Sequence, residues 1–271
     1  MRTLLPVSLF RMKKYFALVL LSALACSSPS KENKKEEAPL VTKKDTSALD
    51  SIPADLGSFT ARVRDGKISK EEAIRIIKTV MPLVKNYYFT AGGKDDSGED
   101  WVFPLRGYNA KTIGGKDGSG YIDDGYSFFD GNKHKGHPAL DIFINDANQD
   151  NLDDVTKKPV DVLSVSAGIV IATVNNWEST SDQRGGNYIW IYDPARFSLF
   201  YYAHNSDVLV KPGTIVRAGD VIAHVGRTGL NAYKKRSPTH LHFMQLVFDV
   251  ESVPRPVNPF RALSQARSLG K

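Results

Sequence analysis

The stretch His240-Leu241-His242-Phe243-Met244-Gln245-Leu246-Val247-Phe248 is rich in aromatic and branched apolar residues. This composition is typical of a β-strand. Because side chains at positions i and i+2 of a strand point to the same face, His240 and His242 are expected to share one groove beside a sheet. The fold is therefore expected to be built around this strand.

Similar short runs recur between Trp101 and Phe248, separated by glycine and proline. They predict a mostly β protein, with a compact antiparallel β-sheet domain. The clearest strands are 189–192, 199–203, 221–225 and 241–248. The chain has a single cysteine, so no internal disulfide is possible and stability must come from a hydrophobic core.

Two further clusters of polar residues lie upstream, in His137-Pro138-Ala139-Leu140-Asp141 and in Tyr202-Ala203-His204. A catalytic zinc ion usually takes three protein ligands from His, Asp or Glu and leaves the fourth position to water. His137, Asp141 and His242 supply such a set. His204 and His240 then remain to take up or hold protons, because imidazole titrates near neutral pH.

The motifs His137-x3-Asp141, Tyr202-Ala203-His204 and Thr239-His240-Leu241-His242-Phe243, in this order, resemble those of the lysostaphin or LytM-type zinc metallopeptidases. The resemblance covers roughly residues 100 to 250. It implies one zinc ion held by His137, Asp141 and His242, and a catalytic pair formed by His204 and His240. The implied activity is a zinc-dependent endopeptidase that hydrolyses peptide cross-links of bacterial peptidoglycan.

An alternative function is that of a catalytically silent relative that activates other cell-wall hydrolases. Such relatives typically lack one or more of the five motif residues, whereas this chain has all five. Two histidines lie outside the motifs, His134 and His224, and both are expected to be structural. His134 is also an alternative metal ligand, because it lies three residues before His137.

Relative to the family, residues 145–158 form an insertion, which is expected to border the groove and to shape substrate choice. Within it, residues 146–154 carry alternating oxygen-bearing side chains, like the first half of a calcium loop. Asn151 stands where such a loop needs glycine, and Lys157 where it needs a bidentate glutamate. A solvated acidic loop is therefore expected, with Ca²⁺ binding as the alternative.

Residues 1–25 resemble a secretory signal peptide, with a basic start followed by an apolar run that is too short to cross a bilayer. Met12 is an alternative start to Met1. Cys26 follows directly, as the lipidated cysteine does in bacterial lipoproteins. The protein is therefore expected in the cell envelope, anchored to a membrane through a lipid on Cys26, at the outer membrane or the periplasmic side. It would be secreted if Cys26 is not acylated.

Removal of residues 1–25 takes away four basic side chains and lowers the net charge from +6 to +2. A nucleic-acid partner is therefore not expected. The expected partners are the peptidoglycan peptide substrate and a membrane, and the sequence does not indicate whether the protein has protein partners.

The composition predicts a disordered tether over residues 26–58, a helical segment over 59–98, the peptidase domain over 99–262 and a C-terminal tail over 263–271. Ser69 and Glu72 form a capping-box pair ahead of an amphipathic helix spanning 68–88, which Pro82 is expected to kink or end early. The polar loop 94–100 is a candidate for blocking the groove.

Overall fold

The computed structural model describes residues 47–270, with side chains from residue 56 onward. The predicted signal peptide (1–25), Cys26 and most of the predicted tether (26–58) lie outside the described residues. None of the helices within 47–270 is long and apolar enough to cross a membrane.

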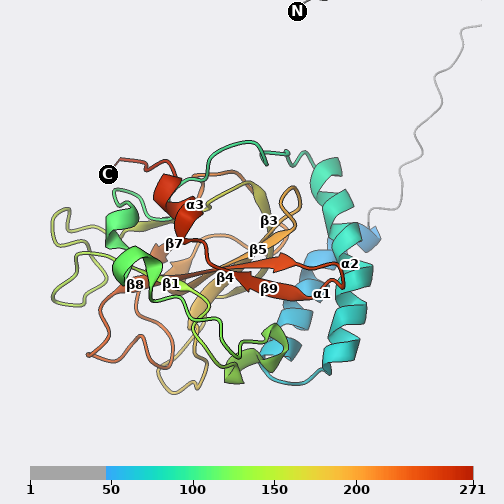
Figure 1. Ribbon diagram of the computed structural model, residues 1–271, viewed down its shortest axis with the longest axis horizontal. Coiled ribbons are helices and arrows are strands. Elements are labelled where there is room, and N and C mark those ends of the chain that lie inside the picture. The colour runs from blue at the N-terminus through green and yellow to red at the C-terminus, as the bar shows by residue number, and fades with distance from the viewer. Residues whose placement is uncertain (1–46, 271) are drawn as a thin grey trace, which may run out of the picture. The chain divides into compact units, whose positions relative to one another are not determined.

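Two α-helices precede the sheet (Figure 1): α1, Ser47–Arg64, and α2, Lys70–Thr90. The first begins inside the range predicted as a tether, so that prediction is wrong for residues 47–58. Leu56, Phe59 and Val63 recur at helical spacing and are buried, because α1 packs against strand β3 (Gly168–Val174). This tertiary burial stabilises a helix that composition alone does not indicate.

Helix α2 begins as predicted, since the Ser69 side chain accepts a hydrogen bond from the Glu72 backbone N–H at 3.2 Å. The buried residues of this helix recur every three or four positions: Ala73, Ile77, Met81, Val84 and Tyr88. Pro82 lies inside the helix and does not end it, so the prediction of an early end is wrong. Burial of residues on both sides of Pro82 offsets the local cost of proline.

The sheet is antiparallel and has nine strands, with the main order β1-β8-β5-β4-β3-β6. Its central strands are β4 (Asn187–Asp193), β5 (Ser198–Val208) and β8 (His240–Phe248). The remaining strands are β1 (Leu140–Phe143), β2 (Asp161–Leu163), β6 (Ile215–Val216), β7 (Val221–Val225) and β9 (Pro254–Val257). The predicted mostly β, antiparallel fold is confirmed, and all four strands predicted from the sequence are present.

Short helical turns complete the fold: η1 (Ala110–Thr112), η2 (Lys116–Gly118), η3 (Phe128–Lys133) and the C-terminal helix α3 (Phe260–Gln265). The last of these falls across the boundary predicted between the domain (99–262) and a tail (263–271). Leu263 is buried in the core, so the chain beyond residue 262 is part of the fold.

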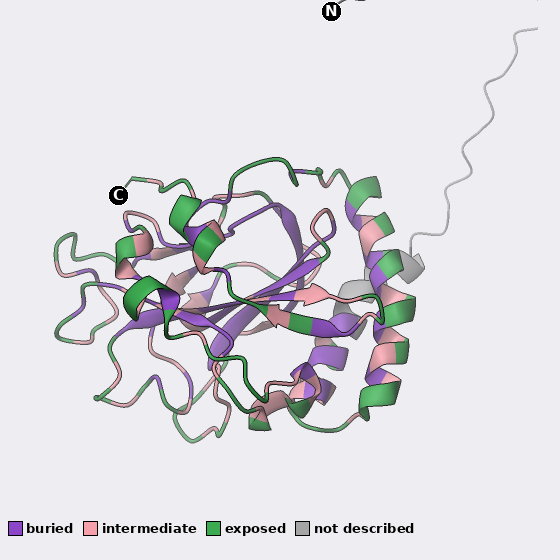
Figure 2. Ribbon diagram, in the orientation of Figure 1, coloured by how far each residue is buried: buried purple, intermediate pink, exposed green. Residues whose placement is uncertain are grey.

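The two faces of the sheet carry two different hydrophobic clusters, and Figure 2 shows the buried strands between more exposed helices and loops. In β8, Leu241 and Phe243 belong to one cluster, whereas Met244 and Leu246 belong to the cluster that also contains the buried residues of α1 and α2. By strand alternation, His240 and His242 lie on the face opposite Leu241 and Phe243, which is the face that the two helices cover.

Candidate metal centre and catalytic site

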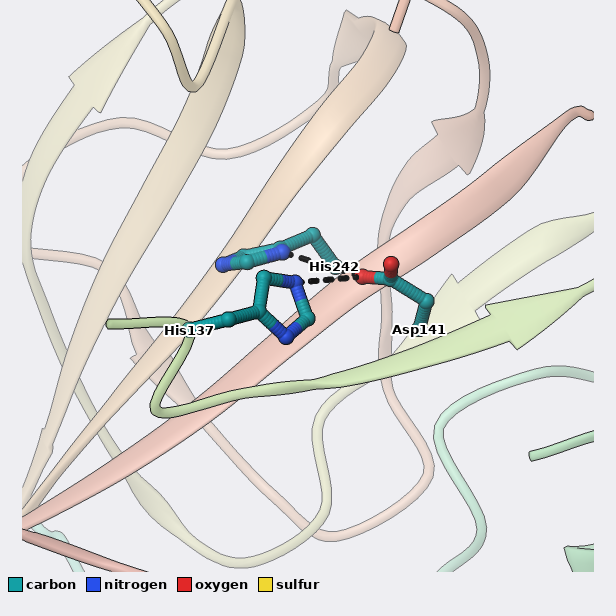
Figure 3. A group of neighbouring side chains, drawn as sticks. All are labelled: His137, Asp141 and His242. Atoms are coloured by element: carbon teal, nitrogen blue, oxygen red, sulfur yellow. Dashed lines mark hydrogen bonds and ion pairs between the residues drawn. The ribbon is translucent and has the colours of Figure 1, made fainter. Parts of the chain in front are cut away.

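Strand pairing brings the predicted zinc ligands together. Asp141 on β1 is directly opposite His242 on β8 in the antiparallel register. His137 comes from the segment before β1, where its backbone exchanges hydrogen bonds with Ile122 at 2.6 and 2.9 Å. Figure 3 shows both imidazole rings directed at the Asp141 carboxylate.

The donor atoms of this group are close enough to share one ion. Asp141 Oδ1 is 3.0 Å from His242 Nδ1 and 3.3 Å from His137 Nε2. One ligand atom from each of the three residues lies within 4.8 Å of the others. Among the side chains described, from residue 56 to residue 270, no other group of three or more His, Cys, Asp or Glu meets this criterion. His137, Asp141 and His242 are therefore positioned to hold a metal ion.

The protonation states suit a metal site. Burial raises the pKa of Asp141, but hydrogen bonds with His137 and His242 outweigh burial and hold this pKa far below its ordinary value. The carboxylate is therefore ionised. Burial lowers the pKa of His242, which favours the neutral imidazole that binds metal. The hydrogen bond with Asp141 raises the pKa of His137, so a metal ion bound there would displace a proton from this ring.

His204 reaches the same site through a β-bulge in β5. Between the pairs Ile189 with Tyr202 and Asn187 with Asn205, β5 contains one residue more than β4. His204 has a left-handed backbone conformation, with φ of 68°, in the bulge. Its ring centroid lies 4.9 Å from that of His240 and 5.4 Å from that of His242. All five predicted site residues are thus together in the folded protein.

Backbone carbonyls orient three of the four histidines through Nδ1. His137 Nδ1 is 2.9 Å from Gly120 O, His204 Nδ1 is 2.8 Å from Thr228 O, and His240 Nδ1 is 2.7 Å from Pro238 O. Since a carbonyl only accepts, each Nδ1 must carry the proton. In the neutral ring Nε2 is then left with a lone pair, for a metal or for a proton.

The environment of His204 favours its neutral form. Burial, followed by the proximity of His240 and His242, lowers the pKa of His204 well below its ordinary value. The Nε2 atom of His240 lies 3.7 Å from Asp141 Oδ1. The pair is therefore suited to accept and return a proton next to the metal-binding group.

These residues line a pocket of about 330 Å³. The walls come from α1, the η3 region, the β3–β4 loop and the loop before β8. Aromatic side chains form much of the lining: Tyr126, Phe128, Tyr188, Trp190 and Tyr201. Two arginines, Arg64 of α1 and Arg184 of the β3–β4 loop, also line it. The space is large enough for part of a peptide and combines apolar and cationic surface.

The insertion 145–158 does not line this pocket. Gln149 Nε2 donates to Lys235 O at 2.9 Å and Asp146 accepts from the Thr239 hydroxyl at 2.6 Å, so the insertion braces the loop that precedes β8. Gln149 Nε2 also lies 3.4 Å from Ser237 O, and Ser237 lines the pocket, so the insertion contacts the pocket wall without lining the pocket itself. An effect of the insertion on substrate choice stays a prediction.

The predicted calcium segment, 146–154, uses its carboxylates for hydrogen bonds within the protein. Asp146 accepts from the backbone N–H groups of Asp150 and Asn151 at 3.0 and 2.9 Å. Asp154 Oδ2 accepts from Ala147 N at 2.8 Å. The loop contributes no residue to the metal-binding group found within residues 47–270.

The other expectations concern residues away from the site. The loop 94–100 does not line the pocket, since Asp96 binds Arg196 at 2.5 Å and the Ala167 backbone N–H at 2.7 Å. His224 lies between Asp207 and Asp161, outside the pocket. His134 does line the pocket, but it is not in the metal-binding group.

Several supporting residues were missed by sequence reasoning. The Thr228 hydroxyl donates to Asn205 O and accepts from Asn187 N, both at 2.8 Å, while its carbonyl holds His204. Gly229 has a φ of 109°, and a Cβ there would lie 2.3 Å from Arg184 O and 3.0 Å from His204 Nδ1. The glycine is thus required by close packing. The Thr228-Gly229 pair has no distinctive sequence signature.

Comparison with known proteins agrees with this arrangement. Residues 150–259 match the model of peptidase family M23; this segment contains His204, His240 and His242 and begins after His137 and Asp141. No curated protein matches the sequence.

Among solved structures, the chain is similar to the antimicrobial peptidase lysostaphin from Staphylococcus simulans, with 27% identity over 47% of this chain and 43% of that chain and a TM-score of 0.34. It is also similar to a putative glycyl-glycine endopeptidase LytM from Ruminococcus gnavus, with 21% identity over 80% and 86% of the two chains and a TM-score of 0.41. A zinc containing peptidase from Vibrio cholerae shows 20% identity over 63% and 41%, with a TM-score of 0.35. The chain spans less than half of the lysostaphin and Vibrio cholerae chains.

The fold is an antiparallel β-sheet, and one edge of it carries a candidate metal centre of two histidines and one aspartate. The segment 150–259 matches peptidase family M23, and this match agrees with the lysostaphin/LytM-type resemblance of the sequence motifs.

Proposed function

We propose that the protein is a zinc-dependent endopeptidase that hydrolyses peptide cross-links of bacterial peptidoglycan. The observation that carries the proposal is the meeting of His137, Asp141 and His242 in one pocket, with His204 and His240 beside them. The M23 match supports a peptidase, and the order of the motifs supports a substrate in the cell wall.

The chemistry of the donor set fits zinc. Two imidazoles and one carboxylate form a common ligand set for a catalytic zinc ion. The hydrogen bond from His137 Nδ1 to Gly120 O leaves Nε2 free to bind metal. When bound, zinc supplies Lewis acidity toward a carbonyl oxygen and makes water a stronger acid.

The remaining histidines handle protons in this proposal. His204 is neutral, and its Nδ1–H is fixed by Thr228 O, so Nε2 takes the proton of the attacking water and returns it to the leaving amine. His240, fixed by Pro238 O, lies on the same wall and shares this work; once its Nε2 has taken up a proton, it can donate that N–H to the developing negative charge. The aromatic lining reduces access of bulk water to the reacting groups.

We also propose that this activity takes place in the cell envelope, with the chain anchored through a lipid on Cys26. The apolar segment ahead of Cys26 and the position of the only cysteine support this localisation. A labelled fatty acid incorporated by the wild-type chain but not by Cys26→Ala would support the anchor. Equal labelling of both chains would contradict it.

A digestion assay tests the activity. Purified protein is incubated with isolated sacculi, with and without a zinc chelator, and the soluble fragments are identified by mass spectrometry. Release of cleaved cross-link peptides that stops on chelation is the expected result. No release with zinc present would contradict an endopeptidase and leave a role as an activator of other hydrolases, for which stimulated release by a second wall hydrolase is the readout.

A further inference from the structure

Arg184 has a fixed position in the wall of the pocket. Its backbone N–H donates to Asn132 Oδ1 at 2.9 Å, and its Nη1 donates to His134 O at 3.0 Å. The next residue, Gly185, accepts a hydrogen bond from the His204 backbone N–H at 3.0 Å. The guanidinium is therefore held beside the segment that leads to His137 and is coupled through the backbone to His204.

The charge of Arg184 has no carboxylate partner among the side chains of residues 56–270. The second arginine of the pocket, Arg64, is already bound by the Asp65 carboxylate at 2.6 and 3.1 Å. Among the described side chains, Asp141 is the one carboxylate that lines the pocket, and it is already paired with His137 and His242. Arg184 is thus a positive charge available to a ligand in this pocket.

The neighbouring Gln183 provides a second unused donor. Its side-chain Nε2 is buried and has no hydrogen-bond partner within the described part of the chain, although Gln183 lines the same pocket. A buried donor without an acceptor is costly, so such groups are uncommon unless a ligand or water satisfies them. Gln183 and Arg184 are adjacent in sequence and both line this pocket, so a small rearrangement of the Gln183 side chain would place both donors at one acceptor group.

We propose that Gln183 and Arg184 form a subsite for a free carboxylate of the peptide substrate. The inference rests on the proposed endopeptidase function and narrows its substrate class. Guanidinium groups bind carboxylates with two parallel, charge-assisted hydrogen bonds, which an uncharged amide cannot replace. A glycine bridge has no carboxylate along its length. The subsite therefore favours a cross-link in which a carboxylate lies close to the scissile bond.

Two carboxylates of a stem peptide have this chemistry, that of the cross-linking diamino acid and that of a terminal D-alanine. Synthetic cross-linked peptide dimers distinguish them in three forms: both carboxylates free, the diamino acid amidated, and the terminal residue amidated. The wild-type protein is expected to cleave the free form with a kcat/KM about tenfold or more above that of the form whose recognised carboxylate is amidated. The amidated form that is cleaved with the lower kcat/KM identifies which of the two carboxylates the subsite binds.

Substitution tests the residues themselves. In Arg184→Gln the ratio of kcat/KM between free and amidated substrate is expected to fall toward one, and Arg184→Lys to recover part of it. Gln183→Leu should lower the ratio as well, which keeps the test independent of how well an Arg184 variant folds. Lys135→Gln removes a positive charge from an exposed residue that does not line the pocket and is expected to keep the wild-type ratio.

Equal cleavage of all three forms by the wild type, or an unchanged ratio in Arg184→Gln and Gln183→Leu, would overturn the subsite and leave the endopeptidase proposal intact. Failure to cleave any form or sacculi would remove the endopeptidase proposal and the subsite with it. A ratio that also falls to one in Lys135→Gln would show that general charge, not Arg184, sets the preference.

Discussion

His137, His204 and His240 are each fixed through Nδ1 by a carbonyl oxygen of the backbone, at Gly120, Thr228 and Pro238 respectively. A substitution can remove a side-chain acceptor but not a carbonyl oxygen of the backbone. The orientation of each ring therefore depends on the local fold of the backbone. The Nε2 atoms are consequently directed by loops that the sheet holds in place. In our proposal, His137 and His242 bind the metal together with Asp141, while His204 and His240 transfer protons.

Substitution of one histidine of each kind should separate the two roles. His242→Ala is expected to lose both bound zinc and cleavage of sacculi, because a ligand is removed. His240→Ala is expected to retain zinc and to lose about a hundredfold or more in turnover. Zinc content by atomic absorption and fragment release give the two readouts. His224→Gln, outside the pocket, is the control and should keep both; full activity in His240→Ala would reject its role.

The hydroxyl of Thr228 can be tested separately from its carbonyl. Thr228→Val keeps the carbonyl that binds His204 but leaves Asn205 O and Asn187 N without their hydroxyl partner. The free energy of unfolding is expected to fall by about 1–3 kcal/mol, measured by urea denaturation. Thr90→Val, exposed at the end of α2, should change it by less than about 0.5 kcal/mol. Equal effects would contradict a bracing role for Thr228.

At the scale of single residues, the motifs predicted which side chains meet, because strand alternation places His240 and His242 on one face. The direction of the His204 side chain could not be predicted from the alternation of side chains along a regular strand. Tyr202 belongs to the cluster on the far side of the sheet, and the residue two positions later would point the same way in a regular strand. The bulge and the left-handed backbone of His204 reverse this direction, and neither has a recognisable local signal.

Among the elements, α1 contributes Thr60, Val63 and Arg64 to the pocket wall and buries Leu56 against the sheet cluster. Leu56→Ala is expected to lower the free energy of unfolding by about 2–5 kcal/mol, since it leaves a cavity in a packed interface. Leu83→Ala, on the exposed side of α2, is the matched control and should cost less than about 1 kcal/mol. Equilibrium denaturation measures both, and equal losses would contradict the packing of α1.

The insertion 145–158 leads to a prediction about calcium. Its carboxylates already accept hydrogen bonds from backbone N–H groups, so an added ion would have to displace them. The Tm of chelated protein is therefore expected to stay unchanged when calcium is added. A rise in Tm that depends on calcium concentration would show that the loop binds the ion and would revive that alternative.

Prediction of the elements succeeded where local patterns were strong. The capping residue Ser69 and the spacing of Ala73, Ile77 and Val84 identified α2. Helix α1 could not be identified in the same way, because its few apolar residues become stabilising only against β3. The effect of Pro82 on α2 was overestimated for the same reason. Tertiary packing of the helix outweighs the free-energy cost of a proline inside it.

In the molecule as a whole, the sheet separates a purely structural face from a functional one. One cluster of buried side chains fills the first face, while the second carries the five polar site residues together with the helices. The pocket therefore depends on segments from residue 60 to residue 244, well beyond the 150–259 range that matches the family model. We expect the helices, as well as the sheet, to be necessary for a complete site.

A zinc titration of metal-free protein tests the central claim most directly. The chain is stripped with a chelator, zinc is added in steps, and both bound zinc and cleavage of cross-links in sacculi are measured at each step. Our account predicts that cleavage is absent without metal and reaches its maximum at one zinc ion per chain, with neither binding nor recovery in His242→Ala. Full cleavage by protein shown to contain no metal, or a stripped protein that binds no zinc, would contradict it.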